Sequence, residues 1–250
     1  MRNQHTKLSL NISIKLLLVG SALNIILPAG LGDIVKSYFG YIWSGVRERM
    51  LSVSISDKFI AIASLFFISV FSFFFDRDIL ILLIGIICLI PLLILLFSRH
   101  LIIKRFFDKI FVKIKLSKVF KISFSELVNN FDFTYKKLIY SVLLSIVAWC
   151  ITYYLLFLCF TAIFMNITFA QVLVYAPVLT LIRLFPLTLN GIGSDEAAMI
   201  FIFSKFESNS QNILIGALIY RFILMVIPAI IGVFVILTTK KGKKLRESGL

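Results

Sequence analysis

Charged residues are scarce in this 250-residue chain, at 15% of the total, whereas soluble globular proteins contain about 25%. Hydrophobic residues make up 60% of the chain, and the mean hydropathy is +1.02. This balance excludes a soluble globular protein and predicts an integral membrane protein. The length suits a single membrane domain, residues 1–250, without a sizeable soluble catalytic domain.

Histidine and cysteine are also rare, with two and three residues respectively. His5 and His100 are isolated, and no metal-ligand spacing occurs around them. The cysteines sit inside apolar runs without the spacing of a metal site or a disulfide framework, at Cys88, Cys150 and Cys159. We therefore expect no metal, no cofactor and no enzyme active site.

Acidic residues number only 12 against 26 Lys and Arg, which gives a formal net charge of +14. Ten of the 26 lie between Arg99 and Lys137, and five lie between Lys240 and Arg246. Basic clusters beside hydrophobic spans mark cytoplasmic segments and attract anionic headgroups, and no soluble basic face for nucleic acid is visible. The charges predict a multi-pass protein of the cytoplasmic (inner) membrane, with loop 99–137 and tail 240–250 cytoplasmic and no nucleic-acid partner.

Apolar runs predict a helical hairpin over 59–98, a span over 138–165 and a last span over 213–239. With both basic segments cytoplasmic, the segments 9–45 and 170–206 must each enter and leave on one side. The fold class expected is all-α, a polytopic transmembrane helical bundle. It contains two re-entrant, glycine-broken helical hairpins, which can form an inverted repeat.

Both expected hairpins are broken by proline, glycine and then an acidic residue. The first break reads Pro28-Ala-Gly30-Leu-Gly32-Asp33, and the second runs from Pro186 through Gly191-Ile-Gly193 to Asp195. Lipid offers no hydrogen bonds to a broken backbone, so such breaks lie against protein or a cavity. Paired glycine breaks in short apolar segments are typical of the substrate site of a transporter.

The candidate substrate-binding residues are the polar groups at or near these breaks, namely Asp33, Lys36, Lys58, Arg183, Asn190, Asp195, Glu196 and Arg221. Asp33 and Glu196 can alternatively cap helices. Lys36 and Lys58 can alternatively anchor helix ends to headgroups. Arg221 lies deep within the last span, where pairing with an acid or a lipid phosphate fits better than reaching the interface.

The chain resembles the membrane domain of the lysylphosphatidylglycerol synthase and flippase-like family from about residue 10 to 238. The matching pieces are Asn24, Pro28, Gly30, Gly32, Asp33 and Lys36, then Asp57-Lys58, then Pro186 with Gly191-Ile-Gly193 and Glu196-Ala-Ala, and finally Tyr220-Arg221. The resemblance implies a flippase of the inner membrane. It does not imply lysyl transfer, because the aminoacyl-transferase domain that follows in some relatives is not found in these 250 residues.

The first hypothesis is a lipid flippase or transporter that moves a charged or glycosylated headgroup across a bacterial or archaeal cytoplasmic membrane. Asp33 and Glu196 are expected at the cationic or hydroxylated part of the lipid, and Arg221, Arg183 or Lys58 at its phosphate. The alternatives are a non-transporting partner of a glycosyltransferase or lipid-modifying enzyme, and a membrane-embedded transferase acting on lipid phosphates. Membrane lipids are the expected partners in every case, and a homo-oligomer is compatible with each.

Overall fold

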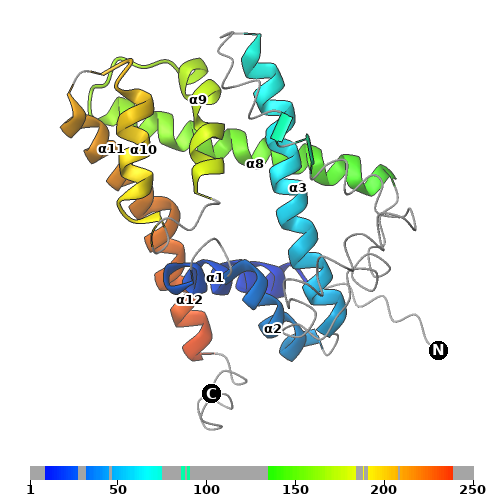
Figure 1. Cartoon of the computed structure of the whole chain (residues 1–250). Helices are drawn as coiled ribbons and strands as arrows, with labels where there is room; N and C mark the ends of the chain where they lie inside the picture. Colours follow the sequence, from blue (N-terminus) through cyan, green and yellow to red (C-terminus); the bar gives the residue numbers. More distant parts are fainter. Residues whose placement is uncertain are drawn as a thin grey trace.

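Figure 1 shows the computed structural model, in which all the regular structure of the described residues is helical. The described residues are 9–27, 32–44, 47–74, 86–87, 89–90, 135–183, 188, 191–207 and 209–238. Most of the second half of the expected hairpin 59–98, most of the loop 99–137 and the whole tail 240–250 lie outside them. For the described part of the chain, the expected all-α membrane fold is confirmed.

Three helices in the described part are long and apolar enough to cross a membrane. They are Val53–Phe73 within α3 (Arg47–Phe73), Lys136–Ala162 within α8 (Tyr135–Ala162), and Ser210–Thr238. These helices correspond to the predicted spans that begin at residues 59, 138 and 213. The first is longer than expected, because Asp57 and Lys58 continue α3 as part of one helix.

The α8 helix supplies the centre of the core and packs against α3, α9 (Phe169–Ile182) and α11 (Ser210–Arg221). In Figure 1 it runs across the upper part of the molecule, past the long α3 helix. Phe160 of α8 is fully buried, and its ring meets the buried ring of Phe203 edge-on at 4.9 Å between centroids. Such pairs add about 0.5–1.5 kcal/mol beyond the area that they bury.

Two hydrogen bonds join α8 to α3. The hydroxyls of Ser145 and Ser64 lie 2.8 Å apart, and Trp149 donates its indole N–H to the carbonyl of Ala61 at 3.0 Å. Polar contacts of this kind between membrane helices are worth roughly 0.6–2 kcal/mol each. They fix the register of the two helices, which apolar packing alone specifies less tightly.

The first helical pair consists of α1 (Leu10–Ile26) and α2 (Gly32–Ser44), which pack against each other. Ser9 caps α1 by accepting the N–H of Ile12. A Cβ on Gly32 would lie 2.6 Å from Oδ1 of Asn24, so only glycine lets α2 begin so close to α1. In Figure 1, α1 crosses the lower part of the molecule between α12 and α3.

The helix Ser210–Thr238 is continuous but has two halves with different neighbours. Its first half, α11, packs against α8 and α10, whereas its second half, α12 (Ile227–Thr238), packs against α1. A π-helical turn, Phe222–Val226, joins them and precedes Pro228, whose ring disfavours a regular helical turn before it. A Cβ on Gly232 would collide with the carbonyl of Leu18, so glycine brings α12 directly onto α1.

The second helical pair consists of α9 and α10 (Ser194–Phe203), which pack together on either side of the second break. Thr168 begins α9 with a capping box, because Thr168 accepts the N–H of Gln171 and Gln171 accepts the N–H of Thr168. The two helical pairs occupy the expected segments 9–45 and 170–206. Their entry from opposite membrane faces and their inverted symmetry stay predictions.

Candidate functional site

The break before α10 depends on two glycines with left-handed backbone. The φ angle is +72° at Gly191 and +86° at Gly193, a region that residues with a Cβ adopt only at a cost. A Cβ on Gly191 would also lie 2.6 Å from Oδ1 of Asp195, whereas nothing lies within 4 Å of a Cβ on Gly193. Gly193 is needed for its backbone alone, and Gly191 also for the space beside a carboxylate.

Glu196 closes the first turn of α10. Its Oε2 accepts the N–H of Gly193 at 2.8 Å, which is the bond that the third helical residue makes in a capping box. Its other oxygen, Oε1, lies 2.7 Å from Nε of Arg221. One carboxylate therefore caps the helix and binds a cation at the same time.

Asp195 binds two arginines through one oxygen. Its Oδ2 accepts from Nε of Arg183 at 2.8 Å and from Nη2 of Arg221 at 3.1 Å. The same Nη2 donates to the carbonyl of Gly191 at 2.7 Å. Arg221 therefore connects both acids of α10 with a backbone carbonyl that the glycine turn leaves outside any helix.

We call Arg183, Asp195, Glu196 and Arg221 the ion-pair cluster. Two guanidinium groups and two carboxylates cancel in charge, and the Asp195 and Arg221 side chains are only 5% and 14% exposed. The N-terminus of α10 further stabilises the two acids, because the helix dipole is positive there. Loss of any one partner would leave an uncompensated buried charge, which is far less favourable than the neutral cluster.

The cluster lies well inside a membrane-length helix. Arg221 follows Ser210 by eleven residues and precedes Thr238 by seventeen, which places it about 16 Å from one end and about 26 Å from the other. Ionisable side chains at such depth face a partner or a substrate pathway and not lipid. The four charged residues of the cluster follow this rule, because each lies within ion-pair distance of a residue of opposite charge.

A cavity of about 420 Å³ opens beside the cluster. Its polar wall contains Glu196, Arg221 and Gly193, and the rest is apolar, formed by Ile25, Ile192, Leu214, Leu218, Met225 and Val226. Ile25 belongs to the last turn of α1, so the end of the first helix before the first break reaches the second break. This volume lies within the range of about 300–1,000 Å³ for small-molecule sites.

The profile of one protein family, described as lysylphosphatidylglycerol synthase TM region, matches residues 1–232. The chain belongs to this family. Comparison with curated proteins and with solved structures gives no match. Membership of the lysylphosphatidylglycerol synthase TM region family places the chain among membrane proteins that handle lipids.

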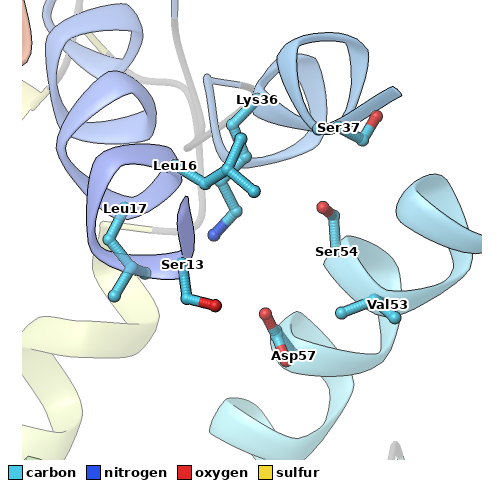
Figure 2. A pocket seen from close by; sticks show the side chains of 9 residues that line it. Ser13, Leu16, Leu17, Lys36, Ser37, Val53, Ser54 and Asp57 are labelled. Carbon is cyan, nitrogen blue, oxygen red and sulfur yellow. The ribbon is translucent and has the colours of Figure 1, made fainter. Parts of the chain in front are cut away.

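This family member has a second polar cavity, which we call the α1–α2–α3 pocket, of about 210 Å³. Its residues are Ser13, Leu16 and Leu17 of α1, Lys36, Ser37 and Gly40 of α2, and Val53, Ser54 and Asp57 of α3. Figure 2 shows the Lys36 ammonium, the Ser13 and Ser54 hydroxyls and the Asp57 carboxylate turned toward one space. Lys36 is only 9% exposed although it is a lysine.

The predicted site residues therefore fall into two places. The structure brings Arg183, Asp195, Glu196 and Arg221 together at the second break, with Gly191 and Gly193 shaping it. Lys36 lines the α1–α2–α3 pocket. Lys58 lies on α3, directly after Asp57 of the same pocket. Asp33 is the second residue of α2, but its side chain lies outside the described part, as do Pro28, Gly30, Pro186 and Asn190.

Sequence reasoning missed the serines of the α1–α2–α3 pocket. Ser13 and Ser54 carry no charge, and serine within an apolar helix usually bonds to its own backbone. Ser13 does this, donating to the carbonyl of Ser9 at 3.2 Å. The one available signal was that Ser54 and Asp57 lie one turn apart beside the start of an apolar span.

Proposed function

We propose that the chain is a lipid flippase or lipid transporter, which binds a charged or glycosylated lipid at the ion-pair cluster and moves its headgroup between leaflets. The proposal assigns movement of the lipid and no chemical conversion. One observation carries it: a buried, charge-balanced cluster opens onto a mainly apolar cavity deep within a membrane-length helix. A polar end and an apolar wall match an amphiphile.

Arg221 is the proposed phosphate ligand. Its contacts within the described residues use Nε and Nη2 and leave the Nη1 donors for a ligand. A guanidinium binds phosphate oxygens through two parallel N–H groups, which a lysine cannot reproduce. Arg183, whose side chain is 30% exposed, is the second cation within reach of the cluster.

The acids are the proposed ligands for an ammonium or hydroxyl group of the same lipid. A phosphate that binds the Nη1 donors of Arg221 shares the positive charge of this guanidinium with the carboxylates. Asp195 and Glu196 then attract a cationic or hydroxylated headgroup more strongly. Asp33 and Lys58 belong to the proposal as headgroup contacts on the side of the first break, where α1 ends beside the cavity.

The long helix Ser210–Thr238 supports a movement of the two sides of this cavity. Its α11 half is packed against α8 and α10, its α12 half against α1, and the π turn between them has no buried residue. π turns in α-helices are frequent at functional sites. Met225 and Val226 of that turn line the cavity, so a change of its angle would change the cavity's shape.

Reconstitution into liposomes tests the proposal. Lipids with a headgroup fluorophore are placed in both leaflets, and a membrane-impermeant quencher reports the rate of exchange between leaflets. We expect wild-type protein to accelerate exchange, and Arg221→Ala and Glu196→Gln to abolish most of the acceleration. Glu207→Gln is the matched control, because Glu207 lies outside the cluster and an amide oxygen can still accept the N–H of Asn209.

Wild-type rates from both cluster variants would remove the cluster from the transport step. No acceleration by correctly folded wild-type protein, together with a glycosyltransferase or lipid-modifying enzyme that co-purifies with it, would instead support the non-transporting partner. These outcomes separate the two functions, since the second does not require the protein to move lipid.

A further inference from the structure

We propose that the α1–α2–α3 pocket is a second lipid site, which binds the hydroxyl groups of a glycerol- or sugar-bearing headgroup. The inference rests on the proposed lipid transport for the nature of the ligand, and it adds a site that the ion-pair cluster does not contain. Four polar groups converge on the pocket from three helices: Lys36, Asp57, Ser13 and Ser54 (Figure 2).

Ser54 is the group that points to a ligand. It is only 5% exposed, and its hydroxyl is turned into the pocket (Figure 2). Two other serines of the apolar helices donate to a carbonyl about one turn earlier, Ser21 to Leu17 and Ser64 to Ala61. The hydroxyl of Ser54 instead faces the pocket, where a ligand can satisfy it (Figure 2).

The charge of the pocket selects a neutral, hydrogen-bonding group. A lone phosphate would be attracted by Lys36 but repelled by the carboxylate of Asp57. A lone ammonium would be attracted by Asp57 but repelled by Lys36. A hydroxyl donates and accepts, so a polyol can donate to Asp57, accept from Lys36 and bond Ser54 together. Its C–H groups would contact the apolar wall formed by Leu16, Leu17 and Val53.

The size and position of the pocket agree with a headgroup. About 210 Å³ is below the roughly 300–1,000 Å³ of sites for drug-sized ligands, so the pocket suits a headgroup and not a whole lipid. Val53, Ser54 and Asp57 stand at the beginning of the candidate span Val53–Phe73. The ends of a spanning helix lie at the depth of the headgroups, so a lipid can present its polar end here and keep its chains in the bilayer.

The α1 helix connects this pocket with the cavity beside the cluster. Leu17 lines the first and Ile25 lines the second, and eight residues of helix separate them by about 12 Å. The two sites therefore lie on one helix, within the length of a lipid headgroup and its glycerol backbone. A headgroup bound in the pocket would be positioned near the start of the path to the cluster.

A pair of matched lipids tests the pocket. Dioctanoyl phosphatidylglycerol and dioctanoyl phosphatidylethanol have the same charge and chains, but only the first carries free headgroup hydroxyls. Binding of each to detergent-purified full-length protein is measured by titration calorimetry. We expect phosphatidylglycerol to bind at least fivefold more tightly. Free glycerol is titrated separately, to distinguish a hydroxyl group on a lipid from a soluble polyol.

Two pocket variants and one control assign the preference to the pocket. Ser54→Ala is expected to reduce the phosphatidylglycerol preference roughly threefold to tenfold, the loss of one hydrogen bond, and Lys36→Gln to reduce it at least as far. Ser69→Ala is the control, because Ser69 is a buried serine of the same helix outside the pocket. It should leave the preference unchanged, and thermal unfolding verifies that each variant is folded.

Equal binding of the two lipids by wild-type protein would overturn the proposal, as would an undiminished preference in folded Ser54→Ala and Lys36→Gln. Glycerol that binds through Ser54 while the two lipids bind equally would overturn the lipid assignment. None of these results depends on leaflet exchange. Loss of exchange in Arg221→Ala with an intact headgroup preference would show that the two sites act separately, and failure of exchange in wild-type protein would count against transport alone.

Discussion

At the break between α9 and α10, four charged side chains bind one another, whereas between α1, α2 and α3 polar side chains from three helices line a pocket. In the ion-pair cluster, Arg221 alone contacts two carboxylates and a carbonyl. In the α1–α2–α3 pocket, the buried Ser54 turns its hydroxyl toward the cavity (Figure 2). The difference indicates that the cluster contributes to the fold as well as to binding, while the Ser54 hydroxyl contributes mainly to binding.

The glycines of the two regions differ in the same way. Gly191 and Gly193 adopt left-handed backbone, so the cluster exists because the chain turns there in a manner that other residues resist. Gly32 is helical, and its role is to admit α2 close to Asn24 of α1. The second break is therefore a specified backbone geometry, and the first, as far as it is described, is a close helix contact.

The largest effect is expected from removing the centre of the cluster. Arg221→Ala leaves Asp195 and Glu196 buried without their shared cation, and it should lower the free energy of unfolding by roughly 3–5 kcal/mol. Unfolding of the purified protein in mixed micelles with increasing denaturing detergent measures this change. Arg183→Ala should have a smaller effect, because Asp195 retains Arg221 and the Arg183 side chain is 30% exposed.

A charge-neutral replacement serves as the control. In the triple variant Arg221→Met, Asp195→Asn, Glu196→Gln, no unpaired charge remains, so the triple variant should be more stable than Arg221→Ala alone. If Arg221→Ala and Glu207→Gln were equally stable, the cluster would have no structural role. The contrast with the pocket would then disappear.

The next largest loss of stability is expected from alanine at the two glycines, and it distinguishes a steric collision of the added methyl group from strain of the backbone. Gly193→Ala should destabilise by about 1–2 kcal/mol through its left-handed φ alone, because nothing lies near the added methyl group. Gly191→Ala should cost clearly more, since its methyl group also collides with the Asp195 carboxylate. The same detergent-unfolding assay measures both.

The excess cost at Gly191 has a direct check. In an Asp195→Ala background the collision is absent, so Gly191→Ala should become no more costly than Gly193→Ala. If Gly191→Ala still destabilised more than Gly193→Ala in that background, Gly191 would be required for its backbone conformation and not for the space beside the carboxylate.

Sequence patterns predicted the membrane class, the three long helices and the residues of the cluster for physical reasons. Hydropathy over about twenty residues identifies a span almost independently of its neighbours. Arg183, Asp195 and Arg221 were visible because charge inside apolar segments has few explanations. The glycines that bring the acids of α10 toward Arg221 were visible as a break in the pattern.

The partners within the cluster and the existence of two cavities could not be predicted. Whether Arg221 meets Asp195, Glu196 or Asp33 depends on how α11 packs against α10, which no local pattern encodes. The sequence hypothesis gathered Lys36, Lys58 and the cluster around one headgroup, and the structure places Lys36 in a separate pocket. Ser54 differs from other serines only in the direction of its hydroxyl, which follows from tertiary packing.

The smallest effects concern three serines of α3 and test whether pocket hydroxyls are dispensable to the fold. Ser64→Ala removes bonds to Ala61 and Ser145 and should destabilise by about 1 kcal/mol. Ser69→Ala removes a buried hydroxyl oxygen without a hydrogen-bond partner, so it should be neutral or stabilise by up to about 1 kcal/mol. Ser54→Ala should lie within about 0.5 kcal/mol of wild type, because its hydroxyl faces the pocket. A loss at Ser54 as large as that at Ser64 would show that this hydroxyl is held by the protein, and the pocket would then resemble the cluster.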